Sequence, residues 1–226
     1  MEEKLFEGQD VGATPSYKEQ AYRLIKDAIL FNRFRTGATY SQENICKELG
    51  ISRTPVREAL LELQKDGYVI FARGKGVRVA PVSDSDAHDI LEMRMYMERL
   101  GARLAGSRAT QEDLKTMEDS LNLLHSKLNT RDGQHLYRID HTFHRGVAAA
   151  AHNRLLYRQC EVLLDHYLRF EVKSVYNNSI DAKIVFDEHV AIYDAIAAKS
   201  PERAEQAMVR HLSNSYHRTV SRYWKE

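Results

Sequence analysis

The chain has 226 residues, of which 43% are hydrophobic and 29% are charged, and its net charge is +1. This apolar content is enough for a packed core and excludes a wholly disordered chain, while no apolar run approaches the length of a membrane span. Residues 1–14 are acidic and lack the apolar stretch of a secretory signal, so we expect a cytoplasmic protein with no membrane partner. Cys46 and Cys160 stand far apart without a metal-type spacing, and both are expected to be reduced thiols.

Positive charge is concentrated in the N-terminal third of the chain. Residues 15–81 contain 12 Lys and Arg but only 7 Asp and Glu, whereas residues 1–14 and 82–226 are each net acidic. A local excess of this sign is typical of a module that binds a polyanion such as DNA. Residues 1–15 show no periodicity and are predicted to be a mobile tail.

Two short helices are predicted after the tail. Ser16 and Glu19 form a capping-box pattern before a run of apolar residues at helical spacing. Ser41 can cap a second helix, with Asn44 at its third position, and Gly50 ends that helix. The second helix therefore leads through a glycine turn into the next helical segment.

The segment that starts at Ser52 predicts the third helix, and with it a helix-turn-helix. Ser52 is placed to cap this helix, whose apolar face comprises Val56, Ala59, Leu60 and Leu63. Arg53, Thr54 and Arg57 lie at its N-terminal end and off the apolar face, where a recognition helix presents side chains to a major groove. Taken alone, the segment fits an ordinary surface helix equally well, and the neighbouring elements favour the DNA-reading interpretation.

A β-hairpin is predicted next. Residues 68–71 are β-branched and aromatic, and residues 77–79 alternate apolar and polar side chains. The turn between them carries Arg73, Lys75 and Gly76, which can lie over a phosphate backbone or a minor groove. Together with the three helices, the hairpin predicts a winged helix-turn-helix over residues 16–80.

The chain changes character after a short linker at residues 80–83. Pro201 is the only proline beyond the linker, and helical periodicity dominates. Six helices are predicted, over residues 84–107, 111–129, 132 or 133 to about 151, 154–175, 182–199 and from 201 toward the C-terminus. Because the loops are short, residues 81–226 are predicted to form an all-α bundle of antiparallel neighbours. The fold class is therefore mainly α.

Four polar side chains are predicted to face the interior of the bundle from three helices. Asp140 and His144 are four residues apart on one helix, at the edge of an apolar stripe. His189 and His211 each lie on the apolar face of a later helix. Three imidazoles and a carboxylate are a plausible ligand set for zinc, nickel or manganese. Histidines that are hydrogen-bonded within a core are the alternative, and inward faces alone leave both interpretations open.

Arg94 also lies on an apolar helix face, and an arginine in such a place needs a partner. Glu98, one turn further on, could be an internal partner. Alternatively, Arg94 could hold the carboxylate of a ligand in the bundle. Asn214, close to His211 on the last helix, could add a polar contact to the same ligand.

Motifs in both halves of the chain point to one family. The N-terminal motifs are Ser-Arg-Thr-Pro-Val-Arg-Glu-Ala-Leu from Ser52, Asp-Gly-Tyr from Asp66 and Gly-Lys-Gly-Val-Arg-Val from Gly74. The motifs of the second half are Glu92-Met-Arg94 with Glu98, Asp140-x-x-Phe-His144, Asn153, Leu156, His189 and His211. The first set resembles the GntR family of bacterial transcription regulators. The second set resembles the FCD effector domain of its FadR branch, and the six helices resemble the VanR-like subtype.

The resemblance implies roles for particular residues. The metal ligands would be Asp140, His144, His189 and His211, and Arg94 would face the effector. The DNA contacts would come from the recognition helix, at Arg53, Thr54 and Arg57, and from the wing, at Lys75 and Gly76. Asn44 occupies a place where some relatives have a DNA-contacting arginine, which leaves the operator preference open.

These expectations combine into a homodimeric transcription regulator, a repressor or an activator, that binds a palindromic DNA operator and uses residues 81–226 for effector binding and dimerisation. Its effector would be a small carboxylate or sugar acid that completes the coordination shell of the metal. A metal-dependent enzyme is the main rival class, because an open position on such a centre can activate water. However, no His-Glu-x-x-His pattern occurs in the chain. A purely structural metal is the third option.

Overall fold

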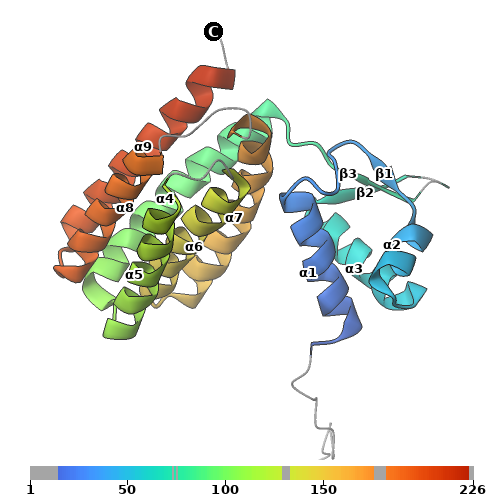
Figure 1. Ribbon diagram of the computed structural model, residues 1–226, viewed down its shortest axis with the longest axis horizontal. Helices are drawn as coiled ribbons and strands as arrows, with labels where there is room; N and C mark the ends of the chain where they lie inside the picture. The colour runs from blue at the N-terminus through green and yellow to red at the C-terminus, as the bar shows by residue number, and fades with distance from the viewer. Residues whose placement is uncertain (1–14, 73, 75, 129–132, 176–181, 224–226) are drawn as a thin grey trace, which may run out of the picture. The chain divides into compact units, whose positions relative to one another are not determined.

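The computed structural model describes residues 15–72, 74, 76–128, 133–175 and 182–223 (Figure 1). Internal contacts divide the chain into two compact units, one up to Pro81 and one from Val82 onward. The first unit combines helices with a small sheet, and the second contains only helices among its described residues. This is the mainly α fold class that the sequence predicted.

The N-terminal unit has the element order of a winged helix-turn-helix. Its described elements are α1 (Tyr17–Leu30), β1 (Thr39–Tyr40), α2 (Gln42–Leu49), α3 (Arg53–Lys65), β2 (Val69–Ala72) and β3 (Gly76–Val79). The capping box of Ser16 and Glu19 is present, and the Ser41 hydroxyl accepts the backbone N–H of Asn44 at 3.0 Å. Ser52 occupies the predicted N-cap position of α3, but its side chain makes no capping hydrogen bond. One physical reason is that the third residue of α3 is Pro55, which has no N–H to donate.

The sheet has the strand order β1-β3-β2, and both pairs are antiparallel. Strands β2 and β3 form the predicted hairpin, with Val69 opposite Val79. Strand β1 was not predicted, because two residues are too few to show an alternating pattern. Gly76 lies against this strand with a φ of +95°, and a Cβ there would be 2.1 Å from the carbonyl oxygen of Tyr40. The glycine is therefore required by the approach of β1 to β3.

The second unit contains the six predicted helices. They are α4 (Asp84–Arg108), α5 (Gln111–Ser126), α6 (Gly133–Ala150), α7 (Arg154–Val175), α8 (Ala182–Ala197) and α9 (Pro201–Tyr223). Side chains of Ser83 and Thr110 complete capping boxes at the starts of α4 and α5. Helix α5 ends earlier than predicted, because the backbone leaves the helical region at Lys127, whose N–H donates to the carbonyl of Leu124. The rest of the predicted extension, at residue 129, lies outside the described residues.

The core of the bundle is made by apolar side chains from all of its helices except α7, which packs on a smaller cluster. Fully buried members include Met117, Phe143, Ile192, Ile196 and Met208. Helix α4 packs against α6, α7, α8 and α9, so it is central to the bundle (Figure 1). None of the described helices is both long and apolar enough to cross a membrane.

Candidate functional site

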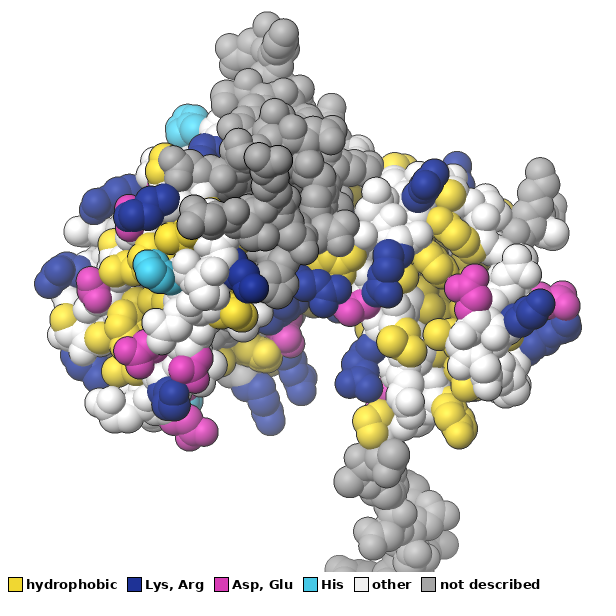
Figure 2. Space-filling model, viewed as in Figure 1, with side chains coloured by type: hydrophobic (Ala, Val, Ile, Leu, Met, Phe, Trp, Pro, Cys, Tyr) yellow, Lys and Arg dark blue, Asp and Glu magenta, His cyan; other side chains and the backbone are white. Residues whose placement is uncertain are grey.

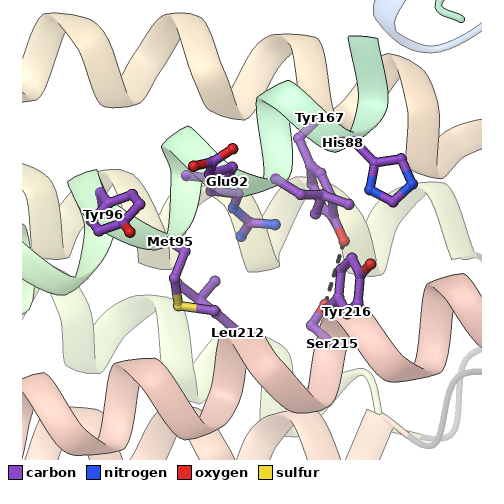
Figure 3. A pocket seen from close by; sticks show the side chains of 10 residues that line it. His88, Glu92, Met95, Tyr96, Tyr167, Leu212, Ser215 and Tyr216 are labelled. Carbon is purple, nitrogen blue, oxygen red and sulfur yellow. Dashed lines mark hydrogen bonds between the residues drawn. The ribbon is translucent and has the colours of Figure 1, made fainter. Parts of the chain in front are cut away.

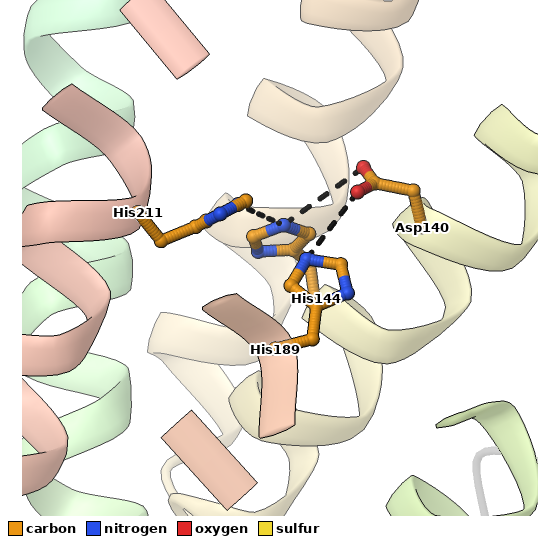
Figure 4. A group of neighbouring side chains, drawn as sticks. All are labelled: Asp140, His144, His189 and His211. Carbon is orange, nitrogen blue, oxygen red and sulfur yellow. Dashed lines mark hydrogen bonds and ion pairs between the residues drawn. The ribbon is translucent and has the colours of Figure 1, made fainter. Parts of the chain in front are cut away.

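A cluster of one carboxylate and three imidazoles lies inside the helical unit. Asp140 and His144 extend from α6, His189 from α8 and His211 from α9, and the four side chains point toward one another (Figure 4). One potential ligand atom from each lies within 4.8 Å of those of the other three. The histidines are buried, and Asp140 is half-buried. The structure thus brings together the four residues that the sequence singled out as metal ligands.

Asp140 is placed to contact two of the imidazoles. Its Oδ1 lies 3.3 Å from Nε2 of His189, and its Oδ2 lies 3.9 Å from Nε2 of His144. His141, the next residue, is turned away from the cluster, and its ring centroid lies 6.4 Å from that of Tyr167. Burial lowers the pKa of His141 to about 3. Asp140 and His144 share one face of α6 because they are four residues apart, whereas His141, one residue after Asp140, points in a different direction.

Carboxylates contact Nδ1 of two of the histidines. Nδ1 of His144 contacts Oε2 of Glu98, and Nδ1 of His211 lies 2.8 Å from Oε2 of Glu188. A carboxylate only accepts hydrogen bonds, so each Nδ1 carries a proton and donates it. In the neutral tautomer with its proton on Nδ1, each imidazole presents a lone pair on Nε2, and the two Nε2 atoms lie 3.1 Å apart. Lone pairs at this distance repel each other unless a cation accepts them, so this geometry fits a metal site with outer carboxylates.

His189 also fits a metal site better than a hydrogen-bonded core. Its ring stacks on that of Phe143, with 4.3 Å between centroids. Both ring nitrogens are buried, and neither forms a hydrogen bond with a described residue, because the 3.3 Å contact of Nε2 with Asp140 is an ion-pair distance without hydrogen-bond geometry. Burial, followed by the neighbouring His211 and His144, lowers its pKa well below the ordinary value, and burial also lowers the pKa of His211. Neutral imidazoles are the form that binds metal.

Glu188 is a functional residue that the sequence analysis missed. Arg218 donates two hydrogen bonds to its carboxylate, each 2.9 Å long, and Asn214 donates a third at 2.8 Å. Burial raises the pKa of Glu188, but hydrogen bonds from His211, Arg218 and Asn214 outweigh it and lower the pKa to about 2. The carboxylate is therefore ionised when it orients His211. Local sequence spacing does not predict these contacts, because His211, Asn214 and Arg218 lie 23 to 30 residues after Glu188 in the sequence.

Arg94 has the internal partner that was one of its two predicted alternatives. Its Nε donates to Oε1 of Glu98, and both side chains are buried. The guanidinium carbon lies 4.1 Å from the ring centroid of Tyr167, and Nη2 lies 3.4 Å from Nε2 of His144. Burial raises the pKa of Glu98, but Arg94 and His144 more than reverse this, so the carboxylate stays ionised. Arg94 is thereby connected to the histidine cluster through Glu98.

Arg94 also lines a pocket of about 390 Å³ between α4, α7 and α9 (Figure 3). The other lining residues are His88, Leu91, Glu92, Met95, Tyr96, Tyr167, Leu212, Ser215 and Tyr216. The volume is at the lower end of the range for ligand pockets, about 300 to 1,000 Å³. Asn214, expected at the effector, is not part of this lining and instead bonds to Glu188. The three tyrosines of the pocket were not predicted.

The residues expected to contact DNA belong to the N-terminal unit. Those on the helices, Asn44, Ser52, Arg53, Thr54 and Arg57, are all exposed. Arg53 lies 3.6 Å from Glu43 in a surface ion pair. Gly76 is half-buried against β1, and Arg73 and Lys75 lie outside the described residues. Figure 2 shows Lys and Arg side chains on the visible surface of both units, with acidic side chains interspersed.

Known proteins match both units. The family description "FCD domain" matches residues 89–214, and "Bacterial regulatory proteins, gntR family" matches residues 17–79. The chain is 27% identical over 204 residues to the uncharacterized HTH-type transcriptional regulator YdhC of Bacillus subtilis (strain 168), covering 89% of each protein. It is 27% identical over 216 residues to the Glc operon transcriptional activator of Escherichia coli (strain K12), covering 86% of this chain and 84% of that protein.

Solved structures agree in fold. E. coli McbR/YncC superposes with a TM-score of 0.83 at 20% sequence identity, covering 93% of this chain and 100% of that chain. The curated relatives are transcriptional regulators rather than enzymes. This agrees with the prediction that the chain is not an enzyme and sets aside the rival interpretation of a metal-dependent catalyst.

Proposed function

The chain is an FCD-domain transcriptional regulator of the gntR family that binds DNA, and we propose that its helical domain senses a small carboxylate next to a bound divalent metal ion. Regulators of this type bind small-molecule effectors, and FCD domains bind metals. The observation that carries the proposal is that Arg94 belongs both to a pocket and to the surroundings of the histidine cluster. It lines the 390 Å³ pocket, and through Glu98 it is also connected to the histidine cluster.

Asp140, His144, His189 and His211 would hold the metal, which we propose to be zinc, nickel or manganese. The mixed nitrogen and oxygen donor set suits these borderline cations. When bound, the ion supplies positive charge that attracts an anionic ligand. Glu98 and Glu188 orient two of the imidazoles, and Arg94, Arg218 and Asn214 hold those two carboxylates in place.

The effector would enter the pocket at Arg94, whose guanidinium would bind its carboxylate. Most of the remaining lining is apolar or aromatic, with Leu91, Met95, Tyr96 and Leu212 among its members. The lining also contains His88, Glu92 and Ser215 and the hydroxyl groups of three tyrosines, which can form hydrogen bonds with the hydroxyl groups of a sugar acid. The lining is therefore compatible with a carboxylate on an apolar body and with a small sugar acid.

The DNA contacts would come from α3, through Ser52, Arg53, Thr54 and Arg57, with Asn44 of α2 beside them. The wing at Arg73, Lys75 and Gly76 would contact the phosphate backbone. Two copies of the chain would bind the half-sites of a palindromic operator as a homodimer and repress transcription. The helical domain would have two conformations, and the effector would act by binding one of them with higher affinity than the other.

The test combines metal analysis with operator binding. Protein without a metal-binding tag, purified from metal-replete medium, should contain about one metal ion per chain by elemental analysis, and a protein with both His189→Ala and His211→Ala should contain none. A screen of carboxylic metabolites by thermal shift, with and without metal, should find ligands that stabilise the wild type. Those ligands should also change operator affinity in a binding assay. Protein without stoichiometric metal, or ligands that bind equally well after chelation, would contradict the proposal.

A further inference from the structure

Helix α3 carries a row of basic residues and one leucine at every fourth position along its solvent side. The row comprises Arg53, Arg57, Leu61 and Lys65, and we refer to these four residues as the α3 stripe. All four are exposed, and Leu61, at 48%, is the one exposed large apolar side chain among the described residues of α3. A spacing of four residues places successive members next to each other on the helix surface. The stripe is therefore basic on both sides of an apolar residue.

The positive charge of the stripe is mostly uncompensated. Arg57 and Lys65 form no ion pair with another residue that the structure describes. Arg53 lies 3.6 Å from Glu43, but the two side chains are 75% and 79% exposed, so this pair contributes little. Leu61 lies about two turns beyond Arg53, whereas a recognition helix contacts base edges through its N-terminal residues. The proposed DNA contacts thus account for the arginines but not for an exposed leucine beside them.

Residues 1–14, which we call the acidic segment, have a complementary pattern. Four acidic residues lie on both sides of an apolar pair, in the order Glu2, Glu3, Leu5, Phe6, Glu7 and Asp10. Lys4 is the one basic residue of the segment, so four negative charges and one positive charge give a net charge of −3. An apolar pair between acidic residues matches a leucine between basic residues in both charge and apolar character.

The acidic segment joins the rest of the chain beside the α3 stripe. Near the start of α1, Nζ of Lys18 lies 2.6 Å from Oε2 of Glu62, and one turn further on the hydroxyl of Tyr22 donates to Asp66 at 2.7 Å. Helices α1 and α3 therefore advance in the same direction, and the chain that precedes α1 arrives from the side of the N-terminal half of α3. Fourteen extended residues reach at most about 46 Å, whereas α3, with 13 residues, is only about 20 Å long. The whole stripe is within reach of the segment.

From these observations we infer that the acidic segment docks on the α3 stripe and competes there with DNA. Leu5 and Phe6 pack on Leu61, and the acidic residues on both sides of them pair with Arg57 and the other cations of the stripe. DNA phosphates need the same cations, so the segment and DNA exclude each other. The inference rests on the DNA contacts proposed for α3 and adds a part of the chain that regulates them.

The covalent link makes even weak docking effective. A short link gives the segment an effective concentration in the millimolar range, so a dissociation constant of about 100 µM for the separate peptide would keep about nine-tenths of the stripes occupied. Competition at that level lowers the affinity for DNA about tenfold. Removal of the docking contacts should raise the affinity by the same factor.

The first experiment detects the docking itself, without DNA. A photoreactive benzophenone side chain replaces that of Phe6 in the full chain, and mass spectrometry maps the cross-links after illumination. The cross-links should fall on residues 53–65, and Leu61→Ser should reduce their yield severalfold. Leu24→Ser is the matched control, because Leu24 is similarly exposed, 55% against 48%, but lies on α1. The control should leave the yield unchanged, and DNA added in excess should suppress the cross-links.

The second experiment separates docking from general repulsion between the acidic segment and DNA. The probe is a duplex that the wild-type protein selects from a random library. Leu5→Ser with Phe6→Ser leaves the net charge unchanged and should raise the affinity for this duplex about tenfold at low salt, and deletion of residues 2–14 should do the same. General repulsion would raise the affinity on deletion but not in the double variant. Circular dichroism should be unchanged in both proteins.

The outcomes distinguish this inference from the proposed function. Cross-links outside residues 53–65, or wild-type DNA affinity in the double variant, would overturn the inference and leave the DNA contacts proposed for α3 in place. Cross-links on residues 53–65 that DNA does not suppress would overturn the competition. If Arg57→Ala then also binds the duplex with wild-type affinity, the DNA contacts proposed for α3 are overturned as well.

Discussion

Nδ1 of His211 lies 2.8 Å from Oε2 of Glu188, and this contact sets which nitrogen of the imidazole is available to a metal. Outer carboxylates of this kind raise the basicity of the ligand and hold its ring, and their loss typically weakens metal binding 10- to 100-fold. We therefore expect Glu188→Gln to raise the metal dissociation constant by about that factor, measured by competition with a chromophoric chelator. Asp187→Asn is the control, because Asp187 is exposed and pairs with Lys183. Equal loss in both variants would contradict this role of Glu188.

The buried pair of Arg94 and Glu98 predicts a strong coupling between two substitutions. Removing one partner of a buried ion pair typically costs about 3–5 kcal/mol, because the other charge is left without compensation. Arg94→Gln should therefore lower the free energy of unfolding by about this amount in urea titrations of chelator-treated protein. Adding Glu98→Gln should recover part of the loss, because no buried charge then remains unpaired. Additive losses would show that the pair is not energetically coupled.

Much of the fold could be predicted from the sequence because its signals are local. Capping residues and apolar spacing located the six helices of the bundle, and Asp140 and His144 share a face by spacing alone. Strand β1 was missed because its two residues pair with β3 rather than with a sequence neighbour. The side chain of Ser52 lacks a capping hydrogen bond, because Pro55 at the third position of the helix has no N–H to donate.

The surroundings of the candidate site could not be predicted in the same way. Glu188 and Arg218 meet only because α8 and α9 pack side by side, and neither residue stands out in its own helix. The same holds for Tyr96 and Tyr216, which line one pocket from α4 and α9. Helical periodicity shows which way a side chain points, but the residue it meets depends on the packing of helices that are distant in sequence.

The recognition helix predicts a substitution that acts on DNA binding alone. Arg57 is exposed on α3 and forms no ion pair with another described residue, so Arg57→Ala should leave the fold intact. We expect at least a tenfold loss of operator affinity and, if Arg57 contacts phosphate, a salt dependence reduced by about one unit of slope. Titrations at several salt concentrations measure both quantities. Arg203→Ala on α9 removes the same charge from the helical unit, and equal effects of the two variants would exclude a specific contact by Arg57.

Two glycines of the wing offer a matched test of the β1–β3 contact. Gly74 and Gly76 both have positive φ, +68° and +95°, but a Cβ at Gly74 would meet nothing within 4 Å. Gly74→Ala should therefore cost only the backbone strain, about 1–2 kcal/mol. Gly76→Ala should cost clearly more, because its Cβ would overlap the carbonyl oxygen of Tyr40. Thermal unfolding of the two variants gives the comparison, and similar melting temperatures would show that the strand contact is not needed for stability.

Buried neutral histidines predict that the metal-free protein loses stability in mild acid. Burial is the first cause that lowers the pKa of His141, to about 3, and it also lowers the pKa values of His189 and His211. The unfolded chain takes up protons at these histidines below about pH 6.5, whereas the folded chain does not, so stability is present above that pH and falls as the pH falls. Each such group contributes a slope of at most about 1.4 kcal/mol per pH unit. Between pH 6.5 and 5 this is about 2 kcal/mol for His141 alone, so His141→Gln should reduce the loss by about that amount in urea titrations with chelator. Equal stability of the wild type at pH 7.5 and pH 5 would contradict neutral burial of these side chains.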